Sequence, residues 1–179
     1  RGASALGWPF PFAAELSFVL EADALAVRMA MTNRHDRPAP AGLGLHPFFP
    51  RTAEATLRFK AGAVWRNGAD HLPSEKIPIP PEWSHDPARR VGTATLDNLF
   101  LEWEGEADIT LAPSPITVRL SASSPFGRLV VFVPEGKPYF ACEPVSHRTD
   151  AINHMEENTG LRVLAPGETL EGEIRFGLR

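Results

Sequence analysis

Prolines and glycines are spread through the whole chain and restrict the folds that it can adopt. The 179 residues include 18 prolines and 14 glycines, and between them no segment keeps an apolar pattern of period 3.6 for three helical turns. A proline inside a helix removes a backbone hydrogen bond and clashes with the preceding turn. This pattern therefore disfavours long helices and favours a fold of strands and turns.

Alternation of residues takes the place of helical periodicity. Leu25, Val27 and Met29 lie on one side of an extended segment, and Arg28 and Thr32 lie on the other. Further strand-like segments occupy residues 12–20, 55–59, 99–103, 116–122, 128–133 and 170–176. Many short strands joined by turn-rich links predict an all-β fold, an antiparallel β-sandwich or barrel.

The segment 67–83, NGADHLPSEKIPIPPEW, is rich in proline and shows no strand pattern. We expect it to form a loop at the rim of the sheets. It is either a solvated connection or a cover that helps to close a site, and the sequence leaves both interpretations open.

Length and composition predict a single domain over residues 1–179. The chain is 43% hydrophobic, which is enough to fill one core. The net charge is −4, with 18 basic and 22 acidic residues dispersed along the chain, so no basic face is available and we expect no nucleic acid partner. No apolar run approaches the roughly 20 residues that cross a bilayer, so we expect no membrane partner.

The cysteine and histidine positions give no metal site. Cys142 is the only cysteine, which excludes an internal disulfide and a zinc site built from cysteines. Four histidines occupy polar turns without the spacing of metal ligands: His35, His71, His85 and His154. We expect a soluble, cytoplasmic protein that binds no metal.

His46 stands between glycines and prolines in GLGLHPFFP, residues 42–50. The glycines permit close backbone approach, and Pro47 favours an extended backbone at His46. An imidazole held in this way can act as a general acid at a binding site, since it titrates near neutral pH. A structural role at the end of a strand is the alternative.

Two acidic residues lie at the ends of apolar segments. Glu143 follows the strand-like run YFAC and precedes Pro144, where we expect the strand ladder to falter. Burial of a carboxylate raises its pKa and can adjust a base to neutral pH. Asp97, in TLDNLF, enters another apolar segment. A salt-bridged glutamate and a turn aspartate are the structural alternatives.

Five segments taken together, and in this order, resemble the aldose 1-epimerase family. They are ALGWPFPF, MTNRHDRPAPAGLGLHPFF, TLDNLF, ACEPVSHRTDAINH and LAPGETLEGEIRF. The resemblance covers nearly all 179 residues and implies the galactose mutarotase-like antiparallel β-sandwich. It also implies that the chain corresponds to the later two-thirds of a family domain and lacks the N-terminal strands.

The resemblance assigns roles to particular residues. The histidine of the family's His-Pro-aromatic motif is the general acid, and the glutamate of its late Glu-Pro motif is the general base; here these are His46 and Glu143. The aspartate of the Leu-Asp motif, here Asp97, binds sugar hydroxyls. Phe48 and His147 are expected to bind substrate too, although a core position for Phe48 and a solvated one for His147 are open alternatives.

The implied reaction exchanges the α and β anomers of a free hexose, with a small-molecule aldose as partner and no cofactor. We expect His46 and Glu143 to come from different strands and to face one open groove, with the C1 atom of a pyranose between them. Two other classes remain open. One is a non-catalytic sugar-binding module, and the other is a glycoside hydrolase that uses Asp97 and Glu143 as its carboxylates.

The start of the recognised motifs gives one more expectation. In the family, ALGWPFPF belongs to the middle of the domain. A sandwich without its first strands exposes unpaired edges and apolar surface. We therefore expect either a further N-terminal segment or association of the chain, as in a homodimer, to cover that surface.

Overall fold

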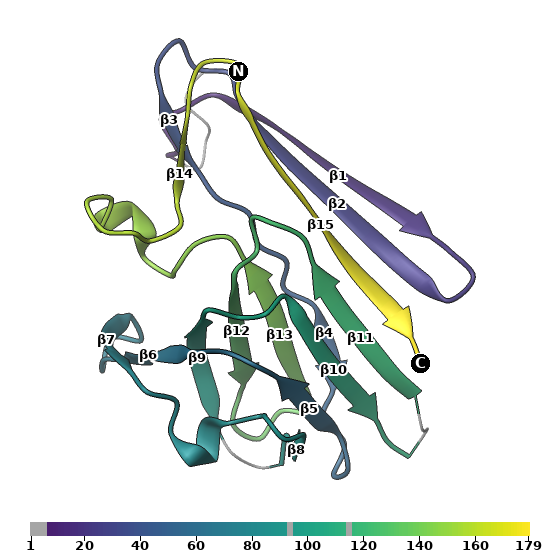
Figure 1. Cartoon of the computed structure of the whole chain (residues 1–179). Coiled ribbons are helices and arrows are strands. Elements are labelled where there is room, and N and C mark those ends of the chain that lie inside the picture. The colour runs from purple at the N-terminus through teal and green to yellow at the C-terminus, as the bar shows by residue number, and fades with distance from the viewer. Residues whose placement is uncertain (1–6, 93–94, 114–115) are drawn as a thin grey trace.

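The computed structural model shows a sandwich of two antiparallel β-sheets (Figure 1) and describes residues 7–92, 95–113 and 116–179. This confirms the predicted all-β fold. Two single turns of 3-10 helix, η1 (Pro81–Trp83) and η2 (Ala151–Asn153), lie in the connections. In the described part of the chain, no helix is long and apolar enough to cross a membrane.

The larger sheet has seven strands in the order β1-β2-β15-β11-β10-β5-β8. Their bounds are β1 (Phe12–Leu20), β2 (Ala24–Asn33), β5 (Thr56–Phe59), β8 (Arg89–Arg90), β10 (Glu106–Leu111), β11 (Ile116–Ala122) and β15 (Thr169–Leu178). Strands from the two ends of the chain therefore lie side by side, since β15 pairs with β2 along its length.

The second sheet has six strands in the order β4-β13-β12-β9-β6-β7. Their bounds are β4 (Phe48–Pro50), β6 (Ala63–Asn67), β7 (Pro73–Ile77), β9 (Leu96–Leu101), β12 (Arg128–Val133) and β13 (Tyr139–Val145). A separate pair joins β3 (Ala39–Ala41) to β14 (Arg162–Leu164). The six-stranded sheet carries Phe48, Asp97 and Glu143, three of the residues that the sequence indicates as functional.

The core lies between the two sheets and gives the six-stranded sheet an inner and an outer face. In β12, Leu129, Val131 and Val133 are buried in the core cluster. Because side chains alternate along a strand, Val130 and Phe132 point away from that core. We call this second side of the six-stranded sheet the outer face.

Strand alternation alone found most of the long strands. Residues 12–20, 116–122 and 128–133 match β1, β11 and β12. The prediction of an unstructured rim loop at 67–83 is wrong, because this segment contains β7 and η1. The strand β7 pairs with β6 at the edge of the sheet, where prolines are tolerated.

Two local expectations are also wrong. The ladder does not falter at Pro144, which pairs with Leu129 inside β13. The Pro144 carbonyl accepts a hydrogen bond from the Leu45 N–H on the side away from β12. In an antiparallel strand the N–H and C=O of one residue point to the same side, so the missing N–H of Pro144 removes no hydrogen bond to β12. His85, expected in a polar turn, is buried and stacks on Phe59, and burial lowers its pKa.

The edge strand β1 carries an exposed apolar row. Phe12, Leu16, Phe18 and Leu20 alternate along the strand and share one side, and each is at least 47% exposed. Figure 1 shows β1 and β2 at the outer edge of the seven-stranded sheet. The predicted exposure of apolar surface is thus present in the described residues, and what covers it stays a prediction.

Core packing should dominate stability. Phe100 in β9 is fully buried, so Phe100→Ala is expected to lower the free energy of unfolding by about 3–5 kcal/mol through lost burial and a cavity. The matched control Phe18→Ala removes an exposed ring and should change it by about 0.5 kcal/mol or less. Chemical denaturation measures both, and equal losses would contradict this core assignment.

Candidate active site

A cavity of about 330 Å³ opens on the outer face of the six-stranded sheet. Its lining residues are His46, Asp97, Val130, Phe132, Glu143, Val145, His147 and Thr149. Four of the five residues predicted for the site are among them, and they come from distant parts of the sequence. The volume lies at the lower end of the range for small-molecule pockets.

Strand register places the two carboxylates on either side of β12. Glu143 of β13 lies opposite Val130, and Asp97 of β9 lies opposite Phe132. Because Val130 and Phe132 share the outer face, both carboxylates project from that face too. The two carboxylates are offset by only two residues along β12, so they line the same cavity.

Backbone hydrogen bonds hold residues 42–46 against the end of β13. The Leu45 N–H donates to the Pro144 carbonyl over 3.1 Å, and the Ser146 N–H donates to the Leu43 carbonyl over 2.9 Å. The Leu43 N–H donates in turn to the Ser146 hydroxyl over 2.8 Å. This segment is therefore fixed alongside β13, although it is not a regular strand.

His46 follows directly and contacts Glu143. Its Nε2 atom lies 3.0 Å from Oε1 of Glu143, with side chains 49% and 11% exposed. The expectation that His46 belongs to a strand is wrong, since Pro47 lacks a ladder donor and β4 begins one residue later. Nor is there room for a sugar C1 atom between the two groups, because they already touch.

Burial changes the acidity of Glu143. Removal of the carboxylate from water, together with repulsion from the negative charge of Asp97, raises the pKa of Glu143 to about 7. A carboxylate with this pKa exchanges protons readily at neutral pH. The cavity therefore places a titrating carboxyl group and an imidazole in direct contact.

Phe48, the fifth predicted residue, lies beside His46 but is not among the residues that line the cavity. Its ring is 58% exposed, lies 4.5 Å from the His46 ring between centroids, and meets the Tyr139 ring edge-on. Phe48 is therefore not a core residue, in contrast to the buried Phe49. An exposed aromatic face beside the cavity can stack on a sugar ring.

Some lining residues were not indicated by the sequence. Val130 and Phe132 belong to RLVVFV, in which every residue after the arginine is apolar, so the pattern does not reveal which side chains face the core. Val145 and Thr149 flank the predicted His147. The proximity of this segment to Glu143 in sequence was the one available signal for them.

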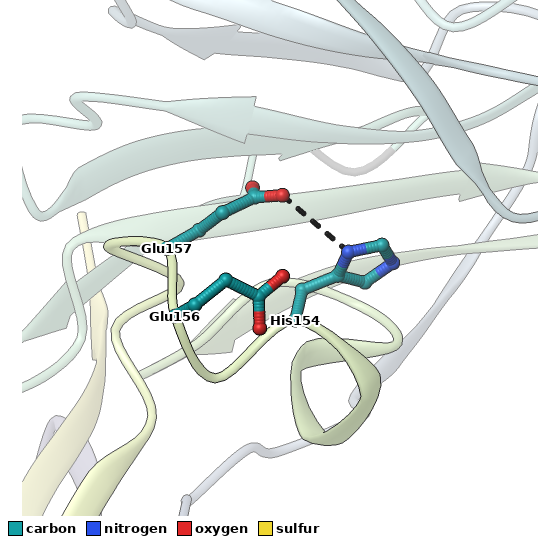
Figure 2. Close-up of side chains that lie close together, drawn as sticks. All are labelled: His154, Glu156 and Glu157. Carbon is teal, nitrogen blue, oxygen red and sulfur yellow. Dashed lines mark ion pairs between the residues drawn. The ribbon is translucent and has the colours of Figure 1, made fainter.

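The structure also groups three residues that sequence spacing did not connect. His154, Glu156 and Glu157 place ligand atoms within 4.8 Å of one another (Figure 2), and the described part of the chain offers no other such group. Both glutamates are exposed, and Glu157 accepts a hydrogen bond from Arg148, whose charge opposes a cation. None of the three lines the cavity.

Comparison with known proteins gives a family. A sequence profile of the aldose 1-epimerase family matches residues 2–177. The chain is 27% identical over 166 residues to the uncharacterized protein YphB of Escherichia coli (strain K12). The aligned region covers 88% of this chain and 57% of YphB. The chain therefore spans less than two thirds of that relative.

Solved structures have the same fold. The crystal structure of a proposed aldose 1-epimerase from Escherichia coli K12 matches with a TM-score of 0.89 and 26% identity, over 95% of this chain and 61% of the other. A galactose mutarotase-like protein from Clostridium acetobutylicum matches with a TM-score of 0.82 and 20% identity, over 95% and 56%. The predicted galactose mutarotase-like fold is confirmed.

The raised pKa of Glu143 predicts a pH-dependent stability. The folded protein binds this proton more tightly than the unfolded chain, so the stabilisation is complete below pH 4.5 and is lost as pH rises through about 7. Glu143→Gln cannot ionise and should lack this loss. As the pH rises from 4.5 to 8, the unsubstituted protein should therefore lose about 3 kcal/mol of unfolding free energy that Glu143→Gln does not lose.

Chemical denaturation across this pH range measures the difference. Glu135→Gln, which removes an exposed carboxylate, is the matched control and should follow the unsubstituted protein. Parallel stability profiles for Glu143→Gln and the unsubstituted protein would contradict the assigned environment of Glu143.

Proposed function

This chain belongs to the aldose 1-epimerase family, and we propose that it interconverts the α and β anomers of a free hexose. In this proposal Glu143 is the general base and His46 the general acid, while Asp97 binds sugar hydroxyls. The relatives that support the family are themselves named as uncharacterized or proposed enzymes, so the activity rests on the arrangement of these side chains.

The reaction needs one proton removed and one supplied. Glu143 takes the proton of the C1 hydroxyl, the C1–O5 bond breaks as the C1 carbonyl forms, and protonated His46 gives its proton to O5. The open aldehyde rotates about the C1–C2 bond. Closure on the other face reverses both transfers, so each group returns to its starting state.

The contact between His46 and Glu143 is the observation that carries this proposal. The two oxygens that exchange protons, the C1 hydroxyl and O5, are bonded to the same carbon. An acid and a base that serve them must therefore lie side by side. The pair meets this requirement, and a sugar can approach across its exposed side.

Two further residues near this pair support the orientation of a sugar. Asp97 is exposed on the same face and can accept hydrogen bonds from hydroxyl groups. Phe48 offers an aromatic face beside His46. Fixing the ring in this way favours proton transfer, because the reacting oxygens stay within hydrogen-bond reach.

Removal of either proton-transfer group should reduce mutarotation. Glu143→Gln and His46→Asn are each expected to lower the enzymatic rate by about 10² or more, the lower range for a positioned acid or base. Polarimetry of freshly dissolved α-glucose and α-galactose measures this rate. Circular dichroism should show that both variants keep the fold.

Matched controls separate these effects from general perturbation. Glu135→Gln and His71→Asn make the same replacements at exposed positions outside the cavity and should keep full activity. An unchanged rate in Glu143→Gln would refute its role as the base. Release of new reducing ends from glycosides would favour a hydrolase, and sugar binding without anomer exchange would favour a non-catalytic module.

Asp97 should act on binding more than on chemistry. Asp97→Asn keeps the shape of the side chain but loses its negative charge, so KM is expected to rise about 10-fold while kcat changes less. Initial rates over a range of aldose concentrations give both constants. A fall in kcat with an unchanged KM would contradict a binding role.

A further inference from the structure

The ring of His147 occupies the space next to Gly42 that a side chain would fill. A Cβ atom added to Gly42 would lie 1.9 Å from Cδ2 and 2.3 Å from Nε2 of His147. Both distances are below the closest approach of real side-chain atoms. Only glycine at position 42 therefore allows the imidazole its place in the wall of the cavity.

The backbone fixes which nitrogen of His147 carries a proton. Nδ1 lies 2.8 Å from the carbonyl oxygen of Arg148. A carbonyl oxygen can only accept, so Nδ1 must donate. In the neutral ring, Nε2 is then an acceptor. No described residue forms a hydrogen bond with Nε2. This atom is also not one of the buried atoms that lack a partner, so it is accessible from the cavity.

Arg148 itself is rigidly held, so its carbonyl is a stable anchor. Its side chain is 5% exposed, and its guanidinium lies 4.7 Å from the centre of the Trp65 ring. The Nη1 group donates to Glu157, and the backbone N–H donates to the Thr159 carbonyl. The side chain of Arg148 thus reaches from the segment after β13 to Trp65 of β6.

We propose that His147 determines sugar specificity by accepting a hydrogen bond at Nε2 from one hydroxyl of the aldose other than the C1 hydroxyl. Gly42 is its positioning residue. The inference rests on the proposed function, because it takes the sugar to be held with C1 at His46 and Glu143. It adds the chemical demand that this second hydroxyl must be free to donate a proton.

The position of His147 agrees with contact to a hydroxyl away from C1. His147 follows Glu143 by four residues and lies beyond the end of β13, whereas His46 contacts Glu143 itself. All three line one cavity. A pyranose with C1 at the acid–base pair can therefore extend toward His147, while Asp97 lies across β12.

Sugar analogues test the hydroxyl directly. For galactose and glucose, each hydroxyl other than that at C1 is replaced in turn by hydrogen or by fluorine, which cannot donate a proton. At one position both replacements should lower kcat/KM about 10-fold, the effect of losing one hydrogen bond. His147→Ala should also lower kcat/KM for the parent sugar about 10-fold, by raising KM. This variant should then act on the parent sugar and on those two analogues with the same kcat/KM.

Two further variants separate binding from a merely structural role. Gly42→Ala should reproduce the loss of discrimination, and its combination with His147→Ala should add little, because both remove one interaction. His147→Gln, which can place an amide oxygen near the former Nε2, should restore part of the discrimination. Gly177→Ala is the matched control, since a Cβ atom there meets nothing within 4 Å.

The outcomes distinguish this inference from the proposed function. If the unsubstituted protein binds the sugars but does not exchange anomers, the proposed function fails, and dissociation constants from NMR titration replace kcat/KM in the same comparison. The role of His147 is overturned if His147→Ala discriminates among the analogues as the unsubstituted protein does. It is also overturned if all analogues behave alike or no aldose binds.

Discussion

The backbone hydrogen bonds between residues 42–46 and the end of β13 are the constraint on which the candidate site depends. They place His46 against Glu143 and leave Gly42 beside the ring of His147. Gly42 and His46 lie about a hundred positions before Glu143 and His147 in the chain. A single backbone pairing therefore brings His46 to Glu143 and forms one wall of the cavity.

The sheet supplies the second requirement, which is a partly buried carboxylate. Glu143 lies opposite Val130 of β12, and the negative charge of Asp97 on β9 lies two residues further along β12. Burial and repulsion together raise the pKa of Glu143 to about 7. Burial and the charge of Asp97 thus lower the stability of the fold when Glu143 ionises, and they also adjust its pKa to the range that suits a general base.

Sequence patterns predicted the long strands and named four of the residues that line the cavity, because alternation and family motifs are local signals. They did not predict β7, where prolines hide an edge strand, or the continuation of β13 through Pro144. Direct contact between His46 and Glu143 depends on a pairing far apart in sequence, and no local pattern contains it. The outward direction of Phe132 depends likewise on which sheet covers β12.

The most direct test of this account is the rate of exchange between the two anomers of galactose and glucose, followed by NMR exchange spectroscopy from pH 5 to 9. The account predicts exchange above the buffer rate that is proportional to protein concentration. Its kcat/KM should pass through a maximum, because the reaction needs Glu143, with a pKa of about 7, without its proton and His46 with one. Exchange at the buffer rate for both sugars at every pH would contradict it.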